Sequence, residues 1–304
     1  MRNPLAPESP VMSDPQKPVR IVQVSDTHVS GKRAYFLDNW DLFVAAMRAD
    51  PPDLIVHSGD LSFDGAGDAD DLAFAAAEKA RLPQPWVAIP GNHDIGESAI
   101  AVRLQQPTNA ARRAAWKQHF GETAWVRDVG AWRVVGIDTS LMGCETDEEM
   151  AQQRFLEGAL QTRGERPVLL FQHMPPYLND VDDPAFTSLA VPHAARGWLL
   201  ETCRTGGVAA IACGHVHVYR RLEHRGLEIV WAPATSFFNI IERQHAGMGV
   251  PRAGYVEWTL TGRSMAHRLV EPPLMLTHDV GAWNKAHGST TKMPPRPVKG
   301  ERPA

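Results

Sequence analysis

The segment WVAIPGNHD (residues 86–94) joins a short apolar run to a run of turn-forming and polar residues. The apolar part is short and follows turn-forming residues, which predicts a buried strand over 86–89. Gly91 permits a tight turn, after which Asn92, His93 and Asp94 present polar side chains at the end of this strand. Ligands of α/β proteins bind beyond the carboxyl ends of the strands, so the segment predicts one part of a ligand site.

Four other apolar runs, at 20–24, 54–57, 168–172 and 208–213, end in the same way. Each is followed by Asp or His, usually beside glycine. The residues concerned are Asp26 and His28, Gly59 and Asp60, His173, and Gly214, His215 and His217. A turn of this kind is common by itself, but five of them at strand ends predict a single shared site.

The residue types in this set match the preferences of transition metals. Two Asp, one Asn and three or four His form a mixed oxygen and nitrogen donor set without sulfur, which suits Mn, Fe, Zn, Co or Ni better than Cu(I) or Ca. The pairs Asp26/His28 and His215/His217 would each point to one side of an extended segment. The set is large enough for two metals bridged by a carboxylate, and two metals about 3.5–4 Å apart form a clamp for phosphate-ester hydrolysis.

The rest of the chain alternates short apolar runs with helical patterns. Further strands are expected over 132–137, 227–231, 255–260 and 265–270, and helices over 39–49, 68–82, 109–120, 148–161 and 193–203. The alternation in the first half predicts βαβ units, whereas the later strands are spaced like hairpins. A mixed α/β architecture with more than one sheet layer follows.

Composition excludes several classes of protein. The 304 residues carry a formal net charge of −4, so the basic excess of a duplex nucleic-acid binder is missing. No run approaches the roughly 18 apolar residues of a membrane span. The three cysteines have neither metal-type spacing nor the number needed for a disulfide framework. With no recognisable signal peptide, these features predict a cytoplasmic protein; they leave open whether it is a homo-oligomer.

Domain boundaries follow from the proline-rich ends of the chain. Residues 1–17 are expected to be a disordered leader, and residues 18–270 to form the folded domain. Residues 271–304 are expected to be a flexible C-terminal extension, because that stretch is rich in proline and basic residues.

The ordered set D-x-H, G-D, G-N-H-D, a single H and G-H-x-H resembles the calcineurin-like metallophosphoesterase superfamily. Within it, the chain looks most similar to the bacterial class III cyclic-nucleotide phosphodiesterase group. The resemblance implies a four-layer αββα sandwich with two central mixed β-sheets flanked by helices. It also implies a binuclear metal centre, in which Asp26, His28 and His217 hold one metal, Asn92, His173 and His215 hold the other, and Asp60 bridges the two.

The resemblance further implies roles for His93 and Asp94. His93 would lie near the leaving group and either donate a proton or stabilise charge on the phosphoryl oxygens. Asp94 would orient His93 by a hydrogen bond. The implied reaction is hydrolysis of small phosphodiesters, such as 3′,5′-cyclic nucleotides or glycerophosphodiesters, by attack of a metal-activated hydroxide on phosphorus.

Other functions use the same residues. A phosphomonoesterase or a nuclease would have the same metal core, so the motifs do not separate these activities. A non-catalytic scaffold would normally lack a ligand or the histidine of G-N-H-D, and this chain has all of them.

Three further positions have a structural interpretation beside a functional one. His57, inside an apolar strand, is expected to be a hydrogen-bonded core histidine. Asp138 is expected to cap a turn, with support of the site as the alternative. Residues 31–33 (Gly-Lys-Arg) are expected to form a solvated loop, with a contact to substrate phosphate as the alternative.

Overall fold

The computed structural model describes residues 17–98, 106–182, 188–238 and 248–288. The predicted leader, apart from Lys17, and residues 289–304 of the predicted extension lie outside these ranges. Two large sheets dominate the described part of the chain.

The first sheet has the strand order β12-β11-β1-β2-β3. Its strands are β1 (Val19–Val24), β2 (Leu54–His57), β3 (Trp86–Ala88), β11 (Tyr255–Thr261) and β12 (Ser264–Val270). Strands β1, β2 and β3 are parallel, whereas β11 pairs antiparallel with both β1 and β12. The three parallel strands therefore end at the same edge of the sheet.

The second sheet has the order β4-β5-β6-β7-β9-β8. Its strands are β4 (Trp125–Val129), β5 (Trp132–Gly136), β6 (Val168–Phe171), β7 (Val208–Cys213), β8 (Arg220–His224) and β9 (Leu227–Trp231). Strands β5, β6, β7 and β9 are parallel, and the two outer strands are antiparallel to their neighbours. Both sheets are thus mixed, as predicted.

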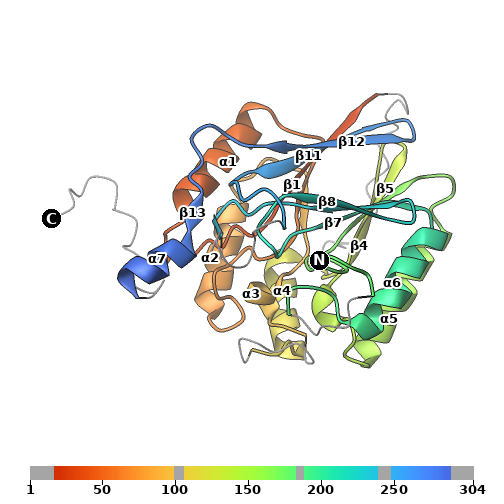
Figure 1. Ribbon diagram of the computed structural model, residues 1–304, viewed down its shortest axis with the longest axis horizontal. Helices are drawn as coiled ribbons and strands as arrows, with labels where there is room; N and C mark the ends of the chain where they lie inside the picture. The colour runs from red at the N-terminus through yellow and green to blue at the C-terminus, as the bar shows by residue number, and fades with distance from the viewer. Residues whose placement is uncertain (1–16, 99–105, 183–187, 239–247, 289–304) are drawn as a thin grey trace, which may run out of the picture.

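The side chains of β1 show how the layers form. Val19 and Ile21 join the apolar cluster between the two sheets, while Val22 and Val24 join the cluster under the helices. This alternation is the period of two expected for a strand buried on both faces. Helices cover the outer faces (Figure 1), which confirms the four-layer αββα prediction. They include α1 (Leu37–Ala49), α2 (Ala69–Lys79), α5 (Asp147–Gln161) and α6 (His193–Thr205).

The expected strands and helices are all present with nearly the predicted bounds, but some elements were missed. These are the edge strands β4 and β8, the short helix α3 (Asn92–Ile95) and the pair β10 (Phe237–Phe238) and β13 (His278–Asp279). Helix α7 (Val280–His287) was also missed, whereas helix α4 (Ala110–Phe120) was predicted. Edge strands such as β4 carry charges and half-exposed side chains, so they lack the apolar pattern of a buried strand.

The segment after residue 270 differs from the flexible extension that was expected. Strand β13 pairs in parallel with β10, and α7 begins at the buried Val280. The Asn39 amide, buried on α1, donates to the Leu276 carbonyl at 2.8 Å and accepts from the Leu276 N–H at 2.9 Å. A side chain distant in sequence therefore holds the backbone of Leu276, and β13 and α7 extend the ordered structure beyond residue 270.

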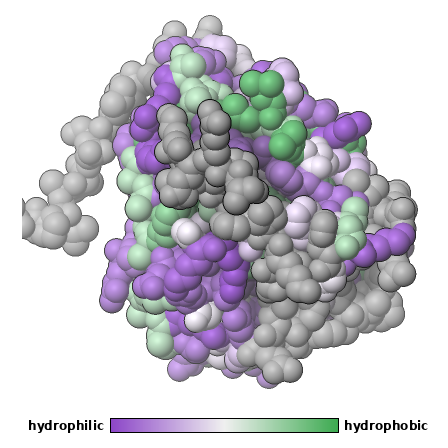
Figure 2. All heavy atoms as spheres, turned by 90° about the vertical axis from the view of Figure 1, so that its left-hand side faces the viewer, coloured by the Kyte–Doolittle hydropathy of each residue, from purple (hydrophilic) through white to green (hydrophobic). Residues whose placement is uncertain are grey.

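The surface around this segment is mainly hydrophilic, with one compact hydrophobic area near the top of the face seen in Figure 2. Leu274 and Leu276, between β12 and β13, are 73% and 60% exposed. Among the described helices, none is both long and apolar enough to cross a bilayer.

Candidate metal centre

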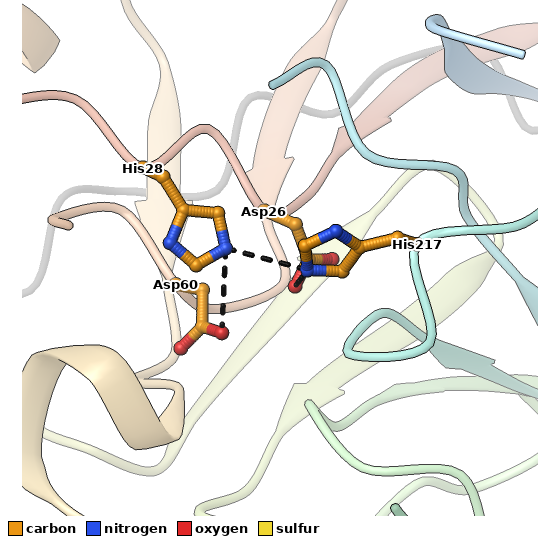
Figure 3. Close-up of side chains that lie close together, drawn as sticks. All are labelled: Asp26, His28, Asp60 and His217. Carbon is orange, nitrogen blue, oxygen red and sulfur yellow. Dashed lines mark hydrogen bonds and ion pairs between the residues drawn. The ribbon is translucent and has the colours of Figure 1, made fainter. Parts of the chain in front are cut away.

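The predicted ligands lie together where strands of both sheets end. One group of mutually close donor atoms contains Asp26, His28, Asp60 and His217, with all ligand atoms within 4.8 Å of one another (Figure 3). A second group contains Asp60, His173 and His215. Asn92 Oδ1 lies 3.3 Å from His173 Nε2 and so belongs beside the second group. Asp60 is common to both groups.

The backbone at these residues is not the extended chain that was expected. Asp26, His28, Asp60, His215 and His217 all have positive φ, between 44° and 70°. This left-handed region disfavours residues with a Cβ by roughly 1–2 kcal/mol each. The alternation of an extended strand is therefore the wrong reason for the pairing within D-x-H and H-x-H. Left-handed turns aim these side chains inward instead, and such strain is typical of functional sites.

Glycines of the motifs are required by close packing between segments. Gly59 has a φ of 103°, and a Cβ there would lie 2.3 Å from His173 Nδ1. A Cβ on Gly214 would lie 1.9 Å from Ser25 Oγ, a contact between the two sheets. No side chain fits at either position without moving a neighbouring ligand or its support.

Three backbone carbonyls orient the histidines. His173 Nδ1 donates to Ser58 O at 2.8 Å, His217 Nδ1 to Phe237 O at 2.5 Å, and His215 Nε2 to Ser188 O at 2.8 Å. A carbonyl oxygen can only accept, so each of these nitrogens carries the hydrogen. The opposite ring nitrogen of each neutral imidazole then presents a lone pair to the site, which is the arrangement typical of metal-binding histidines.

These lone pairs face one another and face carboxylates. His173 Nε2 lies 3.3 Å from Asp60 Oδ2 and 3.2 Å from His215 Nδ1. His217 Nε2 lies 3.3 Å from Asp26 Oδ1. Such an arrangement is repulsive unless a proton or a cation lies between the atoms. The residues therefore fit metal ions by donor chemistry and by the direction of their lone pairs.

The pKa shifts at the site arise from burial and from the same close contacts between histidines and carboxylates. Burial opposes charge on the carboxylates, but His173, His93 and His28 together hold the pKa of Asp60 well below its usual range. In turn, burial opposes charge on His173, but Asp60, Asp26 and the Ser58 carbonyl together raise the pKa of His173 to about 9. Burial, and then His173, lowers the pKa of His215 to about 4. The buried carboxylates stay ionised and attract positive charge into the site.

His93 and Asp94 lie on the short helix α3, and the role expected for Asp94 is wrong. The His93 ring is oriented by Phe63, whose carbonyl accepts from Nδ1 at 2.7 Å. Among the described residues, Asp94 makes no hydrogen bond to His93; it accepts from the backbone N–H groups of Leu61, Ser62 and Gly91 and from the Ser62 hydroxyl. Adjacent residues on a helix point in different directions, so Asp94 clamps the loop after Asp60 instead.

The site opens to solvent at two of its histidines. His93 and His215 are half-buried, whereas Asp26, His28, Asp60 and His173 are buried. A cavity adjoins the second donor group, with small polar side chains on its walls. Its lining includes Asn92, Ser98, Thr139, Ser140, His173, Met174, Ser188 and His215.

His57, Asp138 and Lys32 make contacts that agree with the structural interpretation of these positions. His57 is buried, and its Nε2 is hydrogen-bonded to Thr27 Oγ1 at 3.0 Å, which confirms the core histidine. Asp138 caps a 3₁₀ turn by accepting from the Ser140 N–H at 2.8 Å. Lys32 pairs with Asp68 and Asp70 on the surface. The orienting carbonyls of Ser58, Phe63, Ser188 and Phe237 were missed, because a carbonyl leaves no signal in residue identity.

The relatives of this chain include bacterial proteins that are named as phosphodiesterases. The chain is 29% identical over 208 residues to a probable glycerophosphodiester phosphodiesterase, GpdQ, of Arcobacter nitrofigilis, covering 65% of this chain and 71% of that protein. It is 28% identical over 229 residues to the 3′,5′-cyclic adenosine monophosphate phosphodiesterase CpdA of Escherichia coli K12, covering 71% and 76%.

Solved structures show the same fold in more distant proteins. The purple acid phosphatase PPD1 from yellow lupin superposes with a TM-score of 0.62 at 15% identity, over 87% of this chain and 53% of that longer chain. Residues 19–219, which hold every predicted ligand and His93, match the calcineurin-like phosphoesterase family. The chain therefore belongs to the calcineurin-like phosphoesterase family.

Proposed function

We propose that this protein is a binuclear metal-dependent phosphodiesterase that hydrolyses small phosphodiesters. The observation that carries the proposal is Asp60, whose carboxylate is shared by two groups of converging donor atoms. A carboxylate common to two donor groups can bridge a pair of neighbouring metal ions. The relatives named as cyclic-nucleotide and glycerophosphodiester phosphodiesterases support small diesters of these two classes as substrates.

The ligand roles follow from the two groups. Asp26, His28 and His217 would hold one ion, Asn92, His173 and His215 the other, and Asp60 both. When bound, the two ions activate water and neutralise charge on the phosphoryl oxygens. The oxygen and nitrogen donor set supports Mn or Fe, with Zn or Co as substitutes.

His93 is proposed as the proton-transferring residue. Phe63 O holds the Nδ1 hydrogen, which leaves Nε2 as the nitrogen that gains or releases a proton. The His93 ring packs edge-on against His28, with centroids 4.5 Å apart, so it lies directly beside the donor groups. With a proton on Nε2, His93 can protonate the leaving oxygen or donate a hydrogen bond to a phosphoryl oxygen.

The preference for a diester over a monoester rests on the relatives, which are named as phosphodiesterases. Hydrolysis of bis(p-nitrophenyl) phosphate should exceed that of p-nitrophenyl phosphate when Mn²⁺ is supplied. A preference for the monoester of about tenfold or more, 1.4 kcal/mol in the barrier, would overturn the proposal.

Metal analysis separates an enzyme from a scaffold. Two transition-metal ions per chain after Mn²⁺ supplementation are expected, whereas fewer than one ion per chain without ester hydrolysis would favour a scaffold.

The cytoplasmic location, the lack of duplex nucleic-acid binding and the oligomeric state stay predictions. They can be tested by cell fractionation, by a nucleic-acid binding assay and by sedimentation, respectively.

A further inference from the structure

Strand β1 carries a polar residue on the face that packs against the other sheet. Val19 and Ile21 on this face belong to the apolar cluster between the sheets, and Gln23 follows them at the same spacing. Gln23 is 0% exposed. A buried amide without partners is unfavourable by roughly 1–3 kcal/mol, so its hydrogen bonds must explain its place in this layer.

The Gln23 amide is fully used, and its bonds cross from one sheet to the other. Nε2 donates to Ser58 Oγ at 3.0 Å and to the Cys213 carbonyl at 3.0 Å. Oε1 accepts from Trp258 Nε1 at 3.2 Å. Ser58 directly follows β2 of the first sheet, and Cys213 ends β7 of the second sheet. One side chain therefore links the ends of three strands.

Both partners of Nε2 adjoin ligand residues. Ser58 precedes Gly59-Asp60, and its carbonyl orients His173. Cys213 precedes Gly214-His215. Gln23 itself lies three residues before Asp26 in the chain. The bridge is thus placed at the point where the first sheet supplies Asp26, His28, Asp60 and Asn92 and the second supplies His173, His215 and His217.

We propose that Gln23 is a positioning residue that sets the separation between the two halves of the metal centre. Apolar contacts between sheets have no preferred direction, so they allow small sliding movements, whereas two hydrogen bonds from one amide define a register. The inference rests on the proposed function for its catalytic consequence. Its structural part, that Gln23 holds the segments around Asp60 and His215 together, stands independently.

The test compares three variants of the full chain. Gln23→Met has a similar volume and removes every hydrogen bond of the amide. Ile21→Val, two residues earlier on the same face, perturbs the apolar layer without touching the bridge. Trp258→Phe removes the bond to Oε1 and leaves both bonds of Nε2 in place.

Calorimetric titration with Mn²⁺ and steady-state kinetics form the first measurement. Gln23→Met should weaken Mn²⁺ binding about 10- to 100-fold, the range seen when groups that orient metal ligands are lost. It should also lower kcat at saturating Mn²⁺ more than it raises KM. Trp258→Phe should show a smaller loss in the same direction, and Ile21→Val should match the wild type. Wild-type Mn²⁺ affinity in folded Gln23→Met would overturn the proposal.

Amide hydrogen exchange provides a second measurement that needs neither metal nor substrate. Exchange should accelerate in Gln23→Met and Trp258→Phe at residues 57–62 and 212–218, and not in Ile21→Val. If Gln23→Met does not fold, Trp258→Phe alone decides the outcome. If the wild type hydrolyses no ester or binds no Mn²⁺, the proposed function fails, while the exchange comparison still decides whether Gln23 holds the two halves together. Unchanged exchange at both segments would overturn the inference.

Discussion

The backbone N–H of His215 donates to the carboxylate of Asp26, at 3.0 Å from Oδ2, although the two residues follow strands of different sheets. One predicted ligand therefore holds the backbone of another. The contact is close because Gly214 has no Cβ, which would lie 2.7 Å from Asp26 Oδ2. The candidate metal centre lies at the interface between the two sheets. Substitutions in it should therefore change both metal binding and the packing of one sheet against the other.

Replacing Asp60 with alanine removes the carboxylate shared by both donor groups. We expect activity to fall more than the roughly 10- to 100-fold typical for groups that only orient ligands. Metal analysis should find fewer than two ions per chain. Asp70→Ala is the matched control, because Asp70 is an exposed carboxylate that pairs with Lys32 away from the donor atoms. Two tightly bound ions in Asp60→Ala would contradict the shared role.

His93→Ala should lower kcat by about 10²- to 10⁴-fold, the usual contribution of general acid–base catalysis. The metal content should stay at the wild-type level, since His93 is outside both donor groups. Loss of both ions in this variant would show that His93 is a ligand and not a catalyst.

Asp94→Asn tests the corrected role of Asp94. It weakens the clamp on residues 61–62, so it should lower Tm. The pH profile of kcat should keep its shape, because Phe63 and not Asp94 orients His93. A shifted profile would restore the original assignment of Asp94.

Metal affinity should rise with pH. In the metal-free chain, burial opposes charge on His173, but the nearby carboxylates of Asp60 and Asp26 raise its pKa to about 9, so this histidine is protonated at neutral pH. A metal ion must displace that proton, and the affinity should increase about tenfold per pH unit until the pH reaches the pKa. Calorimetry in buffers of different ionisation enthalpy measures the released proton. An affinity independent of pH between neutrality and this value would contradict the assignment.

A chain ending at Glu271 should lose metal binding as well as stability. It lacks β13, which pairs with β10, and the Phe237 carbonyl of β10 orients His217. A chain ending at Gly288 is the control, because it keeps every described contact. Full Mn²⁺ binding by the shorter chain would argue against a role for this segment.

Asn39→Ala removes the bonds to Leu276 and to Thr235 O, and each lost bond should cost about 1 kcal/mol in the free energy of unfolding.

Lys79→Met should stabilise the protein near neutral pH. Lys79 is buried between Trp86 and Phe120, its Nζ has no hydrogen-bond partner among the described residues, and burial holds its pKa well below the usual value. The folded state therefore binds this proton more weakly than the unfolded state. The resulting destabilisation is complete below the folded pKa and is lost as pH rises through the unfolded pKa.

The expected gain in the free energy of unfolding for Lys79→Met is roughly 1–3 kcal/mol at neutral pH, the cost of burying a polar group without a partner. The difference from the wild type should shrink in alkaline solution. Denaturant unfolding measures both effects. Lys117→Met, at a half-exposed lysine on α4, is the control and should change stability by less than about 0.5 kcal/mol. A less stable Lys79→Met variant would mean that the two aromatic rings compensate the buried charge.

The two-sheet architecture and the donor residues were predictable because their signals are local. Short apolar runs mark buried strands such as β1 and β7, and polar residues just beyond them mark the edge where ligands bind. Family resemblance then grouped the residues, and the structure brings the same residues together around Asp60. Edge strands, the C-terminal segment and the orientation of His93 escaped because their signals lie in contacts and not in residue type.

Sequence alone determined which side chains can bind metal and which layers bury them, since both depend on residue type and short-range periodicity. Only the tertiary structure decided how those side chains are held. The left-handed turns at Asp26 and His217, the carbonyls that orient His93, His173, His215 and His217, and the Gln23 bridge all depend on atoms brought together from separate strands. Backbone carbonyls are the same in every residue, so their positions become informative only when the chain is folded.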